Sequence, residues 1–107
     1  MSATNALTQQ ILNFLFKEGA FAWRQNTTGI WDPRRGIRRA SMKKGVSDIL
    51  GCYKGRMLAI ELKIGSDTLS PEQEGFLASV AHAGGIAFTT GSCEDFLRQW
   101  KLCTEKH

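Results

Sequence analysis

The sequence predicts an α/β fold in which helices flank one mixed central sheet, with the elements in the order α-β-β-β-α-β-α. Three observations favour this class: an apolar stripe at helical spacing near the N-terminus, two strand-like apolar runs joined by a short turn, and a well-capped helix that leads into a further strand and helix. A chain of 107 residues has the usual size of one domain, so we expect a single domain over residues 1–107.

The first two elements are predicted as a helix over residues 4–17 and a strand over residues 20–25. Four large apolar side chains recur on one face of the helix: Leu7, Ile11, Phe14 and Leu15. Gly19 suits the end of this helix because glycine adopts the left-handed conformation at little cost. The strand that follows is short and aromatic, and it leads into a basic loop.

Two central strands are predicted over residues 46–53 and 57–64, joined by the hairpin turn Lys54-Gly55-Arg56. In the second strand the large aliphatic residues occupy alternate positions, so they share one face of the sheet. These residues are Leu58, Ile60, Leu62 and Ile64. Glu61 and Lys63 therefore fall together on the opposite face.

The second half of the chain is predicted to add a helix, a strand and a last helix. Ser70 suits the N-cap of the first of these helices, and Gln73 is placed to return the second bond of a capping box. We expect this helix to end near Ala83, where two glycines follow. Residues 86–90 are typical of a strand, and Ser92 suits the N-cap of the last helix.

The composition excludes several classes of protein. With 42% hydrophobic and 22% charged residues, the chain has the balance of an ordinary globular protein rather than a disordered one. No apolar run approaches the roughly 20 residues that cross a bilayer, and residues 1–10 lack the pattern of a signal peptide. We therefore expect no contact with a membrane and a location in the cytoplasm.

The cysteines do not indicate a disulfide framework or a zinc site. There are three, Cys52, Cys93 and Cys103, widely spaced and accompanied by only two histidines. We expect them to be reduced thiols that are buried or half-buried.

The net charge of +4 is concentrated in one segment. Residues 32–44 carry a charge of +5, and the rest of the chain sums to −1. Six residues supply the positive charge and are the predicted contacts with a phosphate backbone: Arg34, Arg35, Arg38, Arg39, Lys43 and Lys44. Trp23 and Trp31 lie nearby in the sequence and could stack on unpaired bases. The alternative interpretation is a solvated loop whose charge only promotes solubility.

A second cluster of charges lies in the central strands. Glu61 and Lys63 interrupt an apolar strand, and Asp48 lies early in the neighbouring one. Partly buried charges cost several kcal/mol unless they are paired or bound to a metal. Two carboxylates on adjacent strands form the oxygen-rich site that Mg²⁺ prefers, and the backbone carbonyl of Leu62 could add a ligand. The alternative is that Glu61 and Lys63 form an ordinary surface ion pair.

The motifs in this part of the chain resemble the PD-(D/E)XK nuclease superfamily, and more narrowly its virus-type replication-repair nuclease (VRR-NUC) branch. They are Gly45-Val46-Ser47-Asp48, Ile60-Glu61-Leu62-Lys63, Leu69-Ser70-Pro71-Glu72-Gln73 and Gly84-Gly85. The similarity spans about residues 24–96. It implies a restriction-endonuclease-like fold and a DNA substrate, often branched as in a Holliday junction. It also implies homodimers among small members, in a bacterial or phage-infected cell.

The resemblance also implies roles for individual residues. Asp48 and Glu61, with the Leu62 carbonyl, would hold Mg²⁺ or Mn²⁺, and Lys63 would be the catalytic lysine. Gln73 would reach the site from its helix, and Arg24 would contact a phosphate. The expected activity is that of a divalent-metal-dependent DNA endonuclease that hydrolyses phosphodiester bonds.

Two alternatives stay open at this point. Gln73 could serve only the capping box of its helix, which would explain its position without any chemistry. The whole chain could be a nucleic-acid-binding module that keeps the fold and lacks hydrolysis. A role without nucleic acid is less favoured, because the basic segment would then have no function.

Overall fold

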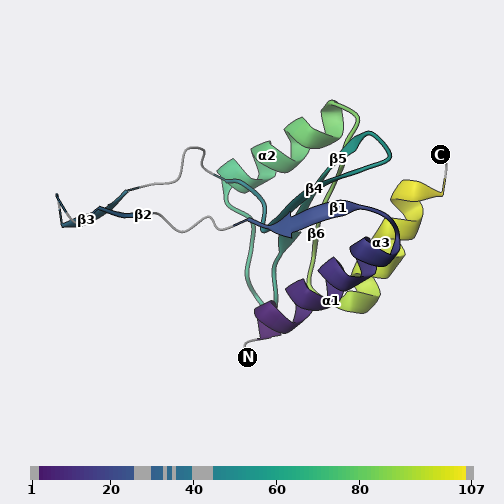
Figure 1. Cartoon of the computed structure of the whole chain (residues 1–107), viewed down its shortest axis with the longest axis horizontal. Coiled ribbons are helices and arrows are strands. Elements are labelled where there is room, and N and C mark those ends of the chain that lie inside the picture. Colours follow the sequence, from purple (N-terminus) through teal and green to yellow (C-terminus); the bar gives the residue numbers. More distant parts are fainter. Residues whose placement is uncertain (1–2, 26–29, 33, 35, 40–44, 106–107) are drawn as a thin grey trace.

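A four-stranded mixed sheet forms the centre of the protein (Figure 1). The computed structural model describes residues 3–25, 30–32, 34, 36–39 and 45–105. The strand order is β1-β4-β5-β6. The strands are β1 (Phe21–Arg24), β4 (Ile49–Tyr53), β5 (Arg56–Leu62) and β6 (Ile86–Thr90). β4 pairs antiparallel with β1 and β5, whereas β5 and β6 are parallel. The predicted mixed sheet is therefore confirmed.

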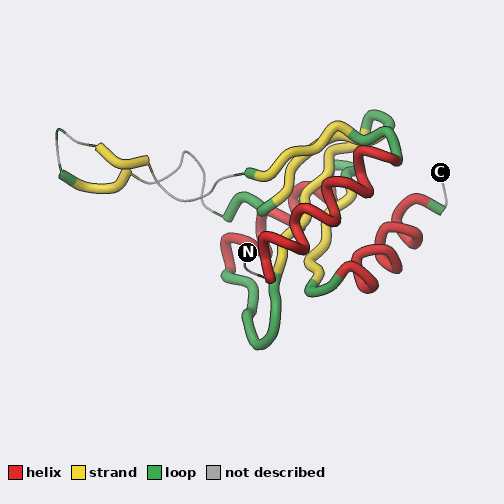
Figure 2. Tube along the Cα trace, turned by 60° about the horizontal axis from the view of Figure 1, so that its bottom comes forward, coloured by secondary structure: helices red, strands yellow, loops and turns green. Residues whose placement is uncertain are grey.

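Helices cover both faces of this sheet, as Figures 1 and 2 show. α1 (Ala3–Lys17) and α3 (Cys93–Thr104) pack against one face, and α2 (Pro71–His82) packs against the other. The α/β class is confirmed, and the elements of the central sheet and its helices follow one another along the chain in the predicted order.

The predicted basic loop contains an additional hairpin, and here the prediction was incomplete. β2 (Ile30–Asp32) and β3 (Ile37–Arg39) pair antiparallel in a two-stranded sheet of their own. Figure 1 shows this hairpin extending away from the central sheet. Each strand has only three residues, which is too short for the alternating pattern that identifies a strand in a sequence.

The turn between β4 and β5 is shorter than predicted. Lys54 and Gly55 form it alone, with φ angles of +48° and +81°, and Arg56 already belongs to β5. Two successive residues with positive φ are typical of the type I′ turn, whose twist matches that of the flanking strands. Tyr53 is consequently paired with Arg56.

The face covered by α1 and α3 holds the main hydrophobic core. The sheet contributes alternate residues of its two central strands, among them Ile49, Leu58 and Ile60, and each is fully buried. The helices contribute large side chains against them: Leu7, Ile11, Leu15, Phe96 and Trp100. Full burial of one such side chain contributes about 1.5–3 kcal/mol, so this face supplies most of the driving force for folding.

The opposite face is covered only in part. Leu77 and Val80 of α2 pack on Ala59 of β5 and complete a smaller core. Beyond α2, toward β1, the side chains of Phe21 and Trp23 remain exposed. We refer to this uncovered part of the sheet, over β1, β4 and the start of β5, as the open face.

The cysteines agree in part with the expectation of reduced thiols that are buried or half-buried. All three cysteines are free thiols; Cys93 and Cys103 are half-buried, but Cys52 is exposed, which corrects the expectation of burial for that residue. Cys52 is exposed because it points to the open face.

In the described part of the chain, no helix has the length and apolar character needed to cross a membrane.

Candidate functional site

The strand register brings the two predicted carboxylates together. Ile49 is paired with Ile60, so Asp48, which directly precedes β4, lies opposite Glu61 of β5. Both acids alternate with residues of the main core and therefore point to the face that α2 partly covers. Lys63 directly follows β5 and shares this face with Glu61.

Three contacts fix the geometry of this cluster. The backbone N–H of Leu62 donates to Oδ2 of Asp48 at 2.7 Å. Nζ of Lys63 lies 4.0 Å from Oε1 of Glu61, and Nε2 of Gln73 donates to the same oxygen at 3.1 Å. The structure thus gathers Asp48, Glu61, Lys63 and Gln73 at the end of two neighbouring strands.

Glu61 is the most perturbed group in the cluster. Its side chain is 3% exposed, and among the described residues its Oε2 atom is buried without a hydrogen-bond partner. Burial, together with the adjacent Asp48 carboxyl, raises the pKa of Glu61 to about 8, although the Lys63 ammonium opposes the shift. Without a further positive charge, Glu61 therefore keeps its proton near neutral pH.

The cluster has the donors that a hard divalent cation requires. A cation at the unpartnered Oε2 of Glu61 would replace the proton of this carboxyl and allow Glu61 to ionise. The N–H and C=O of one residue in an extended strand point to the same edge, so the Leu62 carbonyl is directed toward Asp48. Among the described residues, no cluster of three or more His, Cys, Asp or Glu side chains could hold a metal ion. Two carboxylates and a carbonyl are hard oxygen donors of the kind that Mg²⁺ and Mn²⁺ accept, since these ions bind few carboxylates and keep several waters.

Gln73 serves both of the roles that the sequence left open. Its Oε1 accepts a bond from the backbone N–H of Ser70, and its backbone N–H donates to the Ser70 hydroxyl, which completes the capping box. Its Nε2 is directed to Glu61. The amide group thus joins the start of α2 to the carboxylate cluster.

Three further residues position the cluster, and the sequence analysis did not assign them this role. Gly45 has a φ of +79°, and a Cβ atom there would lie 2.4 Å from the backbone of Glu72, at the start of α2. Ser47 is fully buried beside Asp48, and among the described residues its hydroxyl has no partner. The Thr89 hydroxyl donates to the Glu61 carbonyl. Gly45 shortly before Ser47 and Asp48 was the signal that the sequence offered, since only glycine permits this close approach to the backbone of α2.

Among the predicted phosphate contacts that the structure describes, Arg24 does not share the face of the carboxylates. Arg24 is exposed at the end of β1, paired with Ile49, and therefore points to the face opposite Asp48. Arg34 is exposed, and Arg38 and Arg39 belong to β3. Three of the predicted contacts lie outside the described residues: Arg35, Lys43 and Lys44.

Comparison with models of known families, with curated proteins and with solved structures finds no match to this chain. The interpretation of the site therefore rests on its geometry and on the chemistry of its residues.

Proposed function

We propose that the protein is a divalent-metal-dependent endonuclease that hydrolyses phosphodiester bonds in DNA, on a restriction-endonuclease-like variant of the α/β fold. The observation that carries this proposal is the carboxylate pair of the buried Glu61 and the half-buried Asp48 with Lys63 beside it. Burial and the adjacent Asp48 oppose the ionisation of Glu61, so an ionised Glu61 needs a cation to compensate its charge, and Mg²⁺ or Mn²⁺ suits two carboxylates and a carbonyl.

Each residue of the cluster has a different role in the proposed reaction. A bound cation would lower the pKa of a water molecule and offset negative charge on the phosphate. Lys63 is held near the carboxylates, where its ammonium can contact a phosphate oxygen and stabilise the charge that develops as the bond breaks. Gln73 keeps Glu61 oriented toward the cation through its amide.

The proposal extends to the partners of the site. The basic residues of segment 32–44 add affinity for the DNA backbone, because each contact with a phosphate releases condensed counterions. Branched DNA, including four-way junctions, belongs to the proposed substrates. A homodimer would provide one catalytic centre for each of two strands.

The alternative is a DNA-binding module without activity on the same fold. Lys63 favours the enzyme, because a protein that only binds DNA has no need of a lysine beside a buried acid pair. A variant that removes the ammonium separates the two functions. We expect Lys63→Ala to bind DNA and to lose metal-dependent cleavage.

A cleavage assay tests the proposal directly. Labelled linear and four-way DNA are incubated with Mg²⁺, Mn²⁺ or a chelator, and with wild type, Asp48→Asn or Lys63→Ala. We expect cleavage only with metal, and a loss of at least about 100-fold in both variants. Asp67→Asn and Lys17→Ala change exposed residues of the same types and serve as matched controls. Identical products from wild type and Asp48→Asn would overturn the catalytic assignment.

A further inference from the structure

Three rows of side chains cross this side of the sheet from β1 through β4 to β5, and the open face is the part of them that α2 does not cover, since Ala59 and Glu61 on β5 are buried. From the site outward, the rows are Gln25, Asp48 and Glu61; then Trp23, Leu50 and Ala59; then Phe21, Cys52 and Met57. Gln25 is placed in the first row because its backbone N–H donates a hydrogen bond of 2.7 Å to the Asp48 carbonyl. Side chains on one face of a strand repeat about every 6.5–7 Å, so Trp23 lies one repeat along the strands from the row of the carboxylates, on the strand next to that of Asp48.

The two aromatic side chains form a platform beside the site. Phe21 is 73% exposed and Trp23 is 42% exposed, although both belong to a strand of the central sheet. Their ring centroids lie 5.3 Å apart with an interplanar angle of 50°. The Trp23 indole N–H donates to Oε1 of Gln25 at 3.1 Å, which holds the indole next to the row that contains Asp48.

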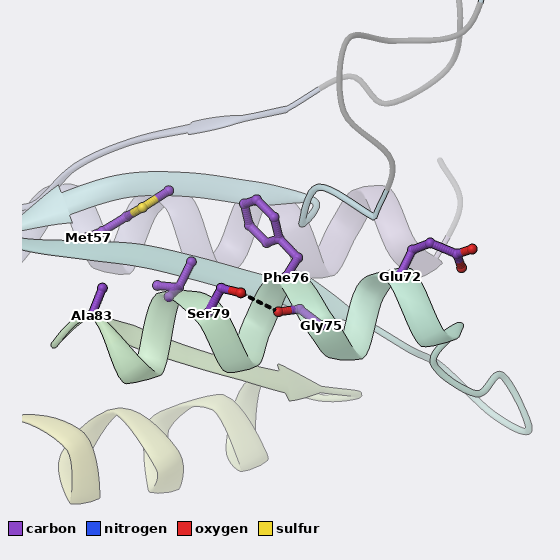
Figure 3. A pocket seen from close by; sticks show the side chains of 7 residues that line it. Met57, Glu72, Gly75, Phe76, Ser79 and Ala83 are labelled. Carbon is purple, nitrogen blue, oxygen red and sulfur yellow. Dashed lines mark hydrogen bonds between the residues drawn. The ribbon is translucent and has the colours of Figure 1, made fainter.

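An apolar groove continues this platform along α2. It has a volume of about 460 Å³ and follows α2 from Glu72, next to Gln73, to Ala83. Figure 3 shows Phe76 projecting from α2 toward the strands, with Met57 on the strand beside it. Met57 belongs both to the groove and to the outermost row, so the platform and the groove are continuous. A volume of this size is in the range that binds small ring systems.

We propose that the open face binds unpaired nucleobases of the strand whose phosphodiester bond lies at the carboxylate cluster. This inference rests on the proposed function and deepens it. Bases stack on Trp and Phe side chains whatever their identity, but only when the faces of the bases are not already covered by neighbours in a duplex. The protein therefore acts on strands that are single-stranded next to the cut, as in a flap or at the branch point of a junction.

The charge and extent of the open face favour a nucleic-acid strand over a second copy of the chain. The two aromatic side chains present roughly 230 Å² if a fully exposed ring presents about 150–250 Å². A standard protein interface needs about 800 Å² on each partner. The two outer rows carry no charged side chain, so bases can lie there while the phosphates reach Lys63 and the cation site.

Binding measurements in chelator separate stacking from cleavage. The anisotropy of labelled single-stranded DNA, single-stranded RNA and blunt duplex of equal length is followed with wild type, Trp23→Ala, Trp23→Phe and Phe21→Ala. We expect Trp23→Ala to weaken binding of the single strands by about 5-fold to 100-fold and to leave the duplex within about 2-fold. Trp23→Phe should retain most of the affinity because it keeps an aromatic face. The DNA and RNA arms show whether the sugar matters.

Two controls are available within the chain. Phe16 is 81% exposed on α1, so Phe16→Ala removes an equally exposed aromatic side chain from another part of the surface and should leave binding unchanged. Cys52 is an exposed thiol in the outermost row, so a bound single strand should slow its alkylation, as measured by peptide mass spectrometry. Thermal unfolding establishes that each variant is folded.

The outcomes distinguish this inference from the proposed function. Equal losses for single strand and duplex, or an effect no larger than that of Phe16→Ala, would overturn the inference and leave the endonuclease proposal standing. A change from dimer to monomer in Trp23→Ala, seen by analytical ultracentrifugation, would also overturn it, because the open face would then be an interface between copies. If Trp23→Ala selectively loses single-strand binding and wild type never cleaves DNA, the inference is supported and the endonuclease proposal is refuted.

Discussion

The two faces of the central sheet are built from the same strands, yet they differ in almost every physical property. The face under α1 and α3 is closed and apolar, with Ile49, Leu58 and Ile60 fully buried. The face under α2 is partly open and holds a buried acid at its end. Alternation along β5 places neighbouring residues in these two environments. The residues that stabilise the fold and those of the carboxylate cluster thus alternate along the same strand and point to opposite faces of the sheet.

This separation explains how the chain tolerates an acid pair in its interior. A carboxylate without a partner costs several kcal/mol, and the whole domain has a net stability of only about 5–15 kcal/mol. The closed face can offset this cost because its core consists mainly of large apolar side chains. The carboxylates can then retain a geometry that suits a cation at the expense of local stability.

The largest expected effect on stability comes from a substitution in the closed face. Leu58→Ala removes a fully buried side chain and should lower the free energy of unfolding by about 2–5 kcal/mol. Met57→Ala, on the adjacent residue and the other face, should lower it by less than about 1 kcal/mol because Met57 is 44% exposed. Urea denaturation of both variants measures the difference. Similar losses would show that the two faces contribute equally.

A smaller effect concerns the proton that Glu61 holds. In the metal-free protein the pKa of Glu61 is raised to about 8, so the folded state keeps a proton that the unfolded chain releases above pH 4.5. The free energy of unfolding should therefore fall as the pH rises from about 4.5 to about 8. Glu61→Gln removes this dependence and, relative to wild type, should gain about 2 kcal/mol across that window, with allowance for solvent screening.

Urea denaturation in chelator at pH 5, 6, 7 and 8 measures this slope. Glu18→Gln changes an exposed acid and provides the control. An unchanged slope in Glu61→Gln would mean that the carboxyl does not titrate as described. Added Mg²⁺ should stabilise wild type more than Glu61→Gln, because the cation takes the place of the proton on Glu61.

The smallest effect separates the two roles of Gln73. Gln73→Met removes both the capping contact and the bond to Glu61, whereas Ser70→Ala removes only the capping hydroxyl. Loss of the cap should cost each variant about 1 kcal/mol of stability. Only Gln73→Met should also weaken Mn²⁺ binding, by about 10-fold, as measured by calorimetry. Equal affinities in the two variants would restrict Gln73 to the helix cap.

Much of the fold and of the site could be predicted because local chemistry determines it. Alternation along β5 identified the residues of its two faces, and Ser70 with Gln73 identified the start of α2. These patterns depend on neighbours in the chain, so they do not require knowledge of tertiary contacts. They were also sufficient to select Asp48, Glu61 and Lys63 as candidates.

The register between β4 and β5 was beyond such reasoning. A three-residue turn over 54–56, as predicted, would place Asp48 opposite Leu62, whereas the observed two-residue turn places it opposite Glu61. A change of one residue in register reverses the facing of side chains, so the meeting of the two acids depends on the positive φ of Lys54. The hairpin of β2 and β3 and the exposure of Cys52 also depend on tertiary packing that no local pattern encodes.

Residues 26–44, which include the basic segment, join two positions beside the carboxylate cluster. The backbone N–H of Gln25 donates to the Asp48 carbonyl before them, and Gly45 lies against the backbone at the start of α2 after them. The entropic cost of closing a loop rises by only about 0.6 kcal/mol for each doubling of its length, so the length of the chain between two fixed positions can change with little penalty. Residues 26–44 can therefore be exchanged, and a new target preference can evolve or be engineered there, while the carboxylate cluster stays as it is.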